Sequence, residues 1–257
     1  MESQRYGKRI GLITFHKFNY GSALQCYATQ EYLRGKGFEV DQIDFAPETN
    51  FIRRYAKAMW NLLTLSLFHP FSVKPIISIF KSQRRNGLRI TKESESFISS
   101  FNDEFINCKL YPSKSIRQIA KESIYKTFLS GSDQVWNGYR IDLYDLYFLR
   151  FAPKYKRIAW AVSFGGNVIA SYNRKKYIRY IKDFRAISVR EPSAVDLVKS
   201  LTGRDAVCLS DPVVLLNEEK WRSLYQKNSK IEKSSETYIL FFFLDKPSER
   251  SVKAAEQ

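Results

Sequence analysis

The chain has 257 residues, of which 44% are hydrophobic and 26% are charged, a balance that excludes a wholly disordered protein. Three scattered cysteines and two histidines without an HExxH motif argue against a disulfide scaffold and against a metal site built from cysteine or histidine. The 42 Lys and Arg residues against 26 Asp and Glu residues give a net charge of +16, which attracts polyanions such as nucleic acid, anionic lipid headgroups or phosphorylated substrates.

The first fifty residues predict a strand, a helix and a second strand. The apolar run at 9–15 is typical of a strand that is buried on both faces. Ser22 is the expected N-cap of the following helix, and Gly35 and Gly37 are expected to end it, because glycine tolerates the left-handed backbone found there. The second strand is expected at 40–45.

A basic stretch at 51–92 interrupts this pattern, with helical periodicity, nine basic residues and no acidic residue. One interpretation is an inserted helical excursion, extending to about residue 110, with a solvated basic face. The other is a membrane-surface or anionic-substrate face, because Trp60 and several leucines lie among the cations, as in interfacial helices. The longest uncharged apolar run, 58–73, is shorter than the ~20 residues that span a bilayer, so we expect no transmembrane helix.

Strands and helices alternate again after Pro112, which predicts a parallel sheet covered by helices on both faces. We therefore expect an α/β fold, with one domain over 1–227. The strands are expected at 125–129, 157–164, 186–189 and 206–209, and the helices at 115–121, 177–184, 192–201 and 218–226.

The last thirty residues predict a further unit. A polar linker is expected at 228–236, followed by an apolar strand at 238–244 and a helix near Pro247. We expect 237–257 to be the start of a second, incomplete α/β domain. No secretory signal precedes the first strand and the cysteine usage suits a reducing compartment, so we expect a cytoplasmic protein.

Ligands of doubly wound sheets bind at the carboxyl ends of the strands, so residues that follow predicted strands are candidates for the site. Three groups of glycines and polar or aromatic residues meet this condition, and a turn or a helix cap is the alternative interpretation of each. They are Asn19, Tyr20 and Gly21 after the first strand, Gly131, Ser132, Asp133, Gln134 and Trp136 after the strand at 125–129, and Ser163 and Gly165 at the end of the strand at 157–164.

Three more candidates carry charge or a titratable ring. Arg190 and Glu191 follow the strand at 186–189, where an arginine is able to hold a carboxylate or phosphate in two-point contact; an ordinary Arg–Glu pair is the alternative. His16 follows the first strand and is a candidate proton donor. The aromatic residues form no stacking platform in the sequence, so we expect no specific nucleic acid partner.

Five motifs, in this order along the chain, resemble the polysaccharide pyruvyl transferase family. The order of the five makes the resemblance specific over about residues 9 to 245, whereas no single motif would. They are IGLITFH…NYGSALQ at 10–25, LSGSDQVWN at 129–137, AVSFG at 161–165, ISVRE at 187–191 and SDP at 210–212.

The resemblance implies two Rossmann-like domains facing each other across a cleft, as in two-domain glycosyltransferases, with this chain containing the first domain and the start of the second. It implies transfer of pyruvate from phosphoenolpyruvate to two hydroxyls of a sugar, forming a cyclic ketal on a cell-surface polysaccharide or its lipid-linked precursor. It implies no metal and no cofactor, phosphoenolpyruvate being the donor substrate. Arg190 matches an arginine expected to contact the donor, and Asp133 is expected to act as a base or a sugar anchor.

Besides a basic membrane-surface protein whose working part is the stretch at 51–92, two alternatives stay open at this point. One is a glycosyltransferase of similar architecture that uses a nucleotide-sugar donor. The other is a non-catalytic binding module, because the second domain of the family supplies further donor-binding arginine and histidine that this sequence does not match. The basic stretch at 51–92 predicts peripheral contact with an anionic membrane, at the inner face of the plasma membrane.

Overall fold

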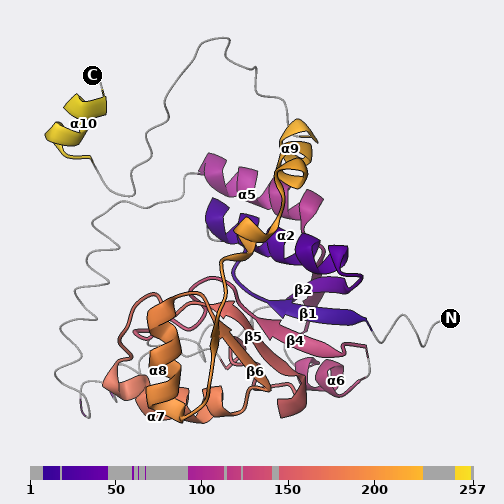
Figure 1. The fold of residues 1–257 in the computed structure, drawn as a ribbon. Coiled ribbons are helices and arrows are strands. Elements are labelled where there is room, and N and C mark those ends of the chain that lie inside the picture. The colour runs from indigo at the N-terminus through magenta and orange to yellow at the C-terminus, as the bar shows by residue number, and fades with distance from the viewer. Residues whose placement is uncertain are drawn as a thin grey trace.

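A computed structural model describes residues 8–17, 19–45, 60, 63, 67, 92–112, 115–122, 124–140, 145–227 and 247–255. Within these residues seven parallel strands form one sheet in the order β3-β2-β1-β4-β5-β6-β7, which confirms the expected α/β fold (Figure 1). The strands are β1 (Arg9–Ile13), β2 (Glu39–Phe45), β3 (Cys108–Tyr111), β4 (Thr127–Ser130), β5 (Arg157–Val162), β6 (Ala186–Val189) and β7 (Val207–Cys208).

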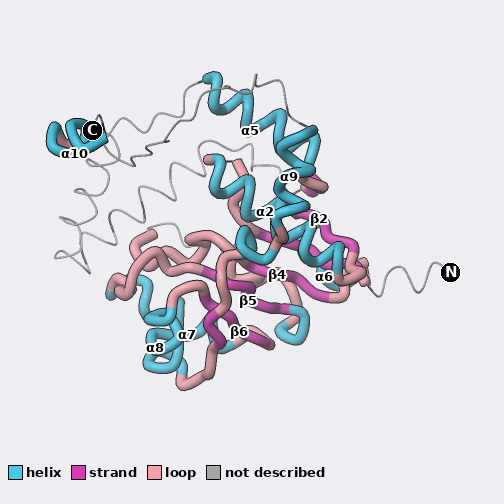
Figure 2. Tube along the Cα trace, turned by 45° about the horizontal axis from the view of Figure 1, so that its top comes forward, coloured by secondary structure: helices cyan, strands magenta, loops and turns pink. Residues whose placement is uncertain are grey.

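Helices cover both faces of the sheet, and the strands lie between the two helical layers (Figure 2). One layer contains α2 (Tyr20–Gly35), α5 (Lys92–Phe105) and α9 (Glu218–Lys227), and the other contains α6 (Ile116–Lys121), α7 (Ser171–Lys182) and α8 (Pro192–Thr202). Two short 3₁₀ helices, η1 (Lys154–Lys156) and η2 (Pro212–Leu215), and the helix α10 (Glu249–Ala255) complete the described elements.

The apolar run of β1 is continuous because its alternate residues enter two separate cores. Leu12 packs with Tyr27 and Leu224 in the layer of α2 and α9, whereas Ile13 belongs to the larger cluster that includes Phe128 and Ile181. Successive side chains of a strand point to opposite faces, so a strand with helices on both sides must be apolar at every position. The continuous apolar run at 9–15, which predicted a buried strand, therefore arises because helices cover both faces of β1.

The helix α2 begins three residues earlier than expected. Asn19, not Ser22, is its N-cap: the Asn19 Oδ1 atom accepts a hydrogen bond from the backbone N–H of Ser22 at 2.8 Å, and the Ser22 Oγ atom accepts one from the backbone N–H of Asn19 at 3.1 Å. This is a capping box, in which both side chains satisfy backbone donors at the helix start. The prediction that Ser22 is the N-cap is wrong because serine occupies the third helical position of that motif.

Two elements of the region assigned to the basic insertion belong to the main fold. The strand β3 pairs with β2 at the edge of the sheet, and α5 packs against α2. The prediction that the insertion extends to about residue 110 is therefore wrong. Most of the basic stretch at 51–92, the linker at 228–236 and the predicted strand at 238–244 lie outside the described residues. Of the helices that the structure describes, none has the length and apolar character to cross a membrane.

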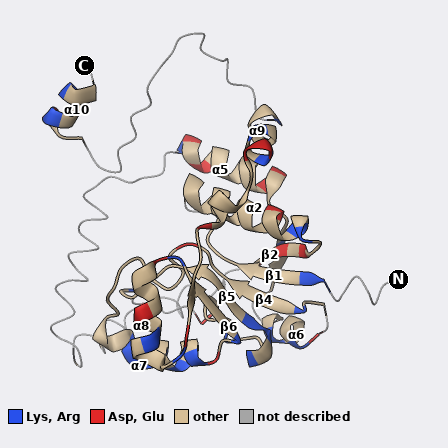
Figure 3. Ribbon diagram, viewed as in Figure 1, with Lys and Arg blue, Asp and Glu red and all other residues tan. Residues whose placement is uncertain are grey.

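Basic residues are concentrated on α7, which contains five Lys and Arg residues and no acidic residue (Figure 3). Asp183 follows this helix and forms ion pairs with three cations. Its carboxylate is 2.7 Å from the Nζ atom of Lys154 and 3.6 Å from the Nη1 atom of Arg157, and it accepts a short hydrogen bond from Arg150. Asp183 thereby joins the end of α7 to the segment that precedes β5.

Candidate functional site

The chain leaves β1 in one direction to form β2 and β3, and it returns to β4 to form the other half of the sheet. The reversal of strand order between β1 and β4 is the topological switch point, where parallel α/β sheets bind ligands at their carboxyl edge. The loops after β1, β4, β5 and β6 meet at this edge, and they contain all of the site residues that the sequence predicts.

The loop after β4 requires glycine at its first position. Gly131 has a φ of 109°, and a Cβ atom there would lie 2.4 Å from the carbonyl oxygen of Trp160. Ser132 is fully buried, and its Oγ atom donates to the carbonyl of Ala161 at 2.8 Å. Asp133 then has a φ of 46°, a left-handed conformation that non-glycine residues rarely adopt. Such strained residues cluster at functional sites, where the surrounding structure holds them in place.

A bulge in β5 holds this loop. Ala161 has a φ of 45°, and the register between β5 and β6 shifts between Ala159 and Val162. The backbone N–H of Ala161 donates to the Oγ atom of Ser188 at 2.9 Å, and the backbone N–H of Ser163 donates to the carbonyl of Asp133 at 2.9 Å. The bulge thus connects the loop after β4 to the ends of β5 and β6, because β-bulges re-aim residues at sheet rims.

An arginine and three carboxylates gather beside this loop. The Nη1 atom of Arg190 donates to the Oδ2 atom of Asp211 at 2.7 Å, and its Nε atom lies 3.5 Å from the Oε1 atom of Glu191. Ser163 donates a short hydrogen bond to the same Oε1 atom. The Oε2 atom of Glu191 is buried and, within the described part of the chain, has no hydrogen-bond partner. A buried carboxylate oxygen without a partner is unusual and calls for an explanation, such as a hydrogen bond from a bound ligand.

Burial and neighbouring charges shift the pKa values of two members of this cluster. Burial raises the pKa of Asp133, and the hydrogen bond from the Gln134 backbone and the charge of Arg190 only partly oppose this. Burial works to lower the pKa of Arg190, but the hydrogen bond to Asp211 and the neighbouring carboxylates outweigh it and raise the pKa. A carboxyl group whose pKa is raised is suited to proton transfer.

The loop before α2 brings backbone N–H groups to the same edge. Asn19, Tyr20 and Gly21 are exposed, but the side chain of Asn19 is occupied in the capping box. Arg140, at the end of the loop after β4, lies against the end of β1: its guanidinium is 5.2 Å from the ring centroid of Phe15. A cation and a helix N-terminus at a switch point favour an anionic ligand.

Trp136 does not fit its predicted contact with substrate. It is 0% exposed, its ring stacks on Phe148 at 5.2 Å, and its Nε1 atom donates to the carbonyl of Tyr147. It is a core residue, so the prediction that Trp136 contacts substrate is wrong. Gln134 is exposed and lies against Gly165, where a Cβ atom would be 2.7 Å from the Oε1 atom of Gln134, so these two residues do line the edge.

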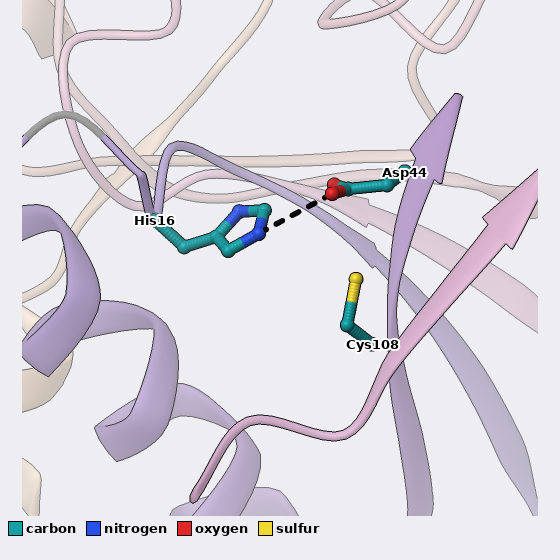
Figure 4. Close-up of side chains that lie close together, drawn as sticks. All are labelled: His16, Asp44 and Cys108. Atoms are coloured by element: carbon teal, nitrogen blue, oxygen red, sulfur yellow. Dashed lines mark ion pairs between the residues drawn. The ribbon is translucent and has the colours of Figure 1, made fainter. Parts of the chain in front are cut away.

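His16 lies in a second cluster, away from the other predicted site residues. It is 4% exposed, and its Nε2 atom lies 3.4 Å from the Oδ2 atom of Asp44 at the end of β2 (Figure 4). The thiol of Cys108 lies beside both. Burial works to raise the pKa of Asp44, but interactions with His16 and Lys17 outweigh it and hold this pKa well below its usual range. Burial, followed by the charge of Asp44, raises the pKa of Cys108 to about 12.

Sequence reasoning missed four residues that the structure brings to these two clusters. Asp44 and Cys108 are far from His16 in the chain, and Arg140 occurs in a loop without a motif, so no spacing indicates any of them. Asp211 lies in the SDP motif at 210–212, directly after a predicted strand, and this position indicates a site residue.

No curated protein matches the chain, and no solved structure matches it. The model of one protein family, described as polysaccharide pyruvyl transferase, matches residues 19–253, which begin at the N-cap Asn19 and include the loop after β4 and the cluster around Arg190. The match covers nearly the whole chain, so this protein belongs to the polysaccharide pyruvyl transferase family and is a transferase.

Proposed function

We propose that this protein transfers pyruvate from phosphoenolpyruvate to two hydroxyls of a sugar, in a cell-surface polysaccharide or its lipid-linked precursor, and forms a cyclic ketal. The family match supports the class of reaction. The observation that carries the proposal is the cluster of Asp133, Arg190, Glu191 and Asp211 at the carboxyl edge of the sheet, in which one carboxylate oxygen is buried without a partner among the described residues.

The reaction adds two sugar oxygens to the C2 atom of the donor, converts its methylene carbon into a methyl group and releases phosphate. Of the two hydroxyl protons, one is added to the methylene carbon of the donor. The other leaves with the phosphate or passes to solvent. A base must accept a proton from the sugar hydroxyls. Asp133 fits this role because its raised pKa and its strained backbone are typical of a residue that transfers protons. The Oε2 atom of Glu191 fits the role of a sugar hydroxyl acceptor.

The donor carries a carboxylate and a phosphate, so its site requires positive charge. Arg190 is already joined to Asp211 and Glu191, which fix its guanidinium but leave the cluster with more negative than positive groups. We therefore assign the donor to the space between Arg190 and the switch point, where Arg140 and the N-terminus of α2 add positive potential. The reaction so written needs no redox cofactor.

The test is incubation of the protein with phosphoenolpyruvate and a sugar acceptor. Acceptor-dependent phosphate release, with a ketal product that contains one pyruvate per sugar, is the expected result. Absence of both would contradict the proposal. Glu191→Gln should raise the KM for the acceptor more than the KM for phosphoenolpyruvate, because Asp211 still holds Arg190, and Glu218→Gln at an exposed position of α9 should change neither.

Two other functions give different results in the same assay. A nucleotide-sugar glycosyltransferase would be protected from heat or protease by a uridine or guanosine diphosphate sugar and not by phosphoenolpyruvate. A non-catalytic binding module would keep its cellular role when Arg190 and Asp133 are both replaced by alanine. The transferase proposal requires that this double variant lose the cellular role.

We also propose that the stretch at 51–92 contacts an anionic membrane from the cytoplasmic side, where a lipid-linked acceptor would be presented. Trp60, Leu63 and Leu67 are 68%, 53% and 73% exposed, and their spacing places them on one face of a helix. Apolar residues among cations are the pattern of interfacial helices. Sedimentation with anionic vesicles that is lost at high salt is expected, and binding that persists on neutral lipid would contradict the electrostatic part.

A further inference from the structure

His16, Asp44 and Cys108 bring three different metal-ligating groups to one place on the sheet. The Nε2 atom of His16, a carboxylate oxygen of Asp44 and the Sγ atom of Cys108 all lie within 4.8 Å of one another (Figure 4). They come from the segment after β1, the end of β2 and the start of β3, which are adjacent strands. The fold therefore assembles a donor set that the sequence disperses over more than ninety residues.

The imidazole of His16 points into this cluster without a hydrogen bond. It is 4% exposed, and among the described residues its Nε2 atom has no hydrogen-bond partner, although the Oδ2 atom of Asp44 is only 3.4 Å away. A buried ring nitrogen that faces a carboxylate without a hydrogen bond between them calls for an explanation, such as an ion that both atoms bind. Two ligands at ~2.0–2.2 Å from a tetrahedral zinc ion are about 3.3–3.6 Å apart, which agrees with the observed separation.

Neighbouring side chains hold the ligands in this orientation. The Nε2 atom of Gln42 lies 3.4 Å from the Oδ1 atom of Asp44, which leaves Oδ2 facing His16. The Nδ2 atom of Asn102 donates to the backbone carbonyl of His16 at 2.9 Å. The first contact acts on a ligand carboxylate, as outer-shell hydrogen bonds of metal sites do, and the second fixes the backbone of His16.

We propose that His16, Asp44 and Cys108 bind one divalent ion of the zinc class through Nε2, a carboxylate oxygen and Sγ. A thiolate and an imidazole favour zinc, cobalt or a similar transition metal over magnesium or calcium, which prefer oxygen ligands. Cys108 is exposed, so its side chain has room for the shift of about 1 Å that closes the set. Its thiol proton passes to solvent on binding.

Three protein ligands leave the fourth position of a tetrahedral ion open, as in catalytic rather than structural zinc sites. The site lies beside β1, β2 and β3, on the side of β1 away from the cluster around Arg190. The inference does not rest on the proposed pyruvyl transfer, and it assigns His16 a role other than proton donor. It also departs from the sequence-based expectation that the protein has no metal site.

Lys17 is the competitor for this ion. Its Nζ atom forms a short ion pair with the Oδ2 atom of Asp44, and 61% of its side chain is exposed, so the ammonium is free to leave when a divalent cation arrives. Asp103 contributes further negative potential near Lys17 and Cys108. The Lys17 ammonium therefore occupies a position at which the Asp44 carboxylate attracts a cation.

The test is titration of the untagged full chain with Co²⁺ in a non-thiol reductant. We expect one Co²⁺ per chain, a thiolate-to-cobalt charge-transfer band, and loss of that band when Zn²⁺ is added. Cys108→Ser should abolish the band, and His16→Gln should weaken binding by more than about 100-fold, since even outer-shell partners change affinity by about 10–100-fold. Lys17→Ala should tighten binding about two- to fivefold, the size of an exposed ion pair.

The matched control is Cys208→Ser, which removes an exposed thiol at β7 and should leave the band intact. The proposal is overturned if wild type gives no charge-transfer band, if the band survives in Cys108→Ser, or if Lys17→Ala weakens binding. Serine replaces an exposed cysteine with little change of shape, and Lys17→Ala changes an exposed side chain, so these two variants remain informative even if His16→Gln fails to fold.

Discussion

Arg190 and Asp211 are joined at the carboxyl ends of β6 and β7, with the Nη1 atom of Arg190 donating to the Oδ2 atom of Asp211 at 2.7 Å. The Oδ1 atom of Asp211 accepts a hydrogen bond from the backbone N–H of Val213 at 3.0 Å, which caps η2. One carboxylate therefore fixes both the start of η2 and the guanidinium of Arg190. Asp211 acts on the site by positioning Arg190.

The first prediction concerns this pair. Asp211→Asn and Arg190→Lys should each lower kcat/KM about 10- to 100-fold, because small misplacements of a charged group in a site have effects of this size and lysine lacks the planar fork of arginine. The double variant should lower kcat/KM by less than the product of the two single reductions, since both substitutions disrupt the same interaction. The measurement is steady-state kinetics at varied phosphoenolpyruvate.

The control for this pair is Asp205→Asn, which breaks the exposed ion pair with Lys199 on the surface. It makes the same chemical change as Asp211→Asn and should leave kcat/KM at the wild-type value. Wild-type activity in both Asp211→Asn and Arg190→Lys would show that this pair does not shape the site.

The second prediction concerns the pH profile. Burial raises the pKa of Asp133, so a base at this position loses its proton only above the range of an ordinary aspartate. The kcat/KM should therefore rise with pH through an acid limb that lies above that range. Asp133→Asn should remove the limb and lower kcat by about 10²–10⁴-fold. An acid limb that persists unchanged in Asp133→Asn would assign the base to another group.

The third prediction concerns Gly131. Gly131→Ala should destabilise the protein by about 2–4 kcal/mol, because alanine is strained at positive φ and its Cβ atom would press on the carbonyl oxygen of Trp160. The matched control is Gly35→Ala at the end of α2, where nothing lies within 4 Å of an added Cβ atom. It should be neutral or stabilising by about 0.5–1 kcal/mol. Urea unfolding measures both, and equal stabilities of the two variants would refute the steric argument.

The fourth prediction concerns Asp183. Burial works to raise its pKa, but the hydrogen bonds from Lys154 and Arg150 outweigh it and lower the pKa below the unfolded value of about 3.9. The ion pairs therefore add stability above that value, and this contribution is lost as pH falls through the folded pKa. Asp183→Asn should cost about 1–3 kcal/mol near neutral pH and less as the pH falls.

This difference is measured by urea unfolding at several pH values. Asp205→Asn serves again as the control, because its carboxylate is at the exposed surface and pairs with one lysine only. A cost for Asp183→Asn that stays the same from neutral to strongly acidic pH would mean that packing, not charge, explains the effect.

The sequence alone determined the fold class and the family of this protein. Continuous apolar runs such as the one containing Leu12 and Ile13 indicate strands buried on both faces, and their alternation with helices leaves a parallel sheet as the only arrangement that covers them. It also located the loops after β1, β4, β5 and β6, because the carboxyl ends of parallel strands must share one edge.

Only the tertiary structure decided what each side chain at that edge does. Trp136 reads as a substrate contact in its motif, yet it packs in the core, while Asn19 is occupied by its helix cap. His16 meets Asp44 and Cys108 only because β1, β2 and β3 are neighbours in the sheet. The local sequence pattern indicates which residues lie on a helix or strand. Contacts between residues far apart in the chain depend on strand order, which long-range packing determines and no short motif indicates.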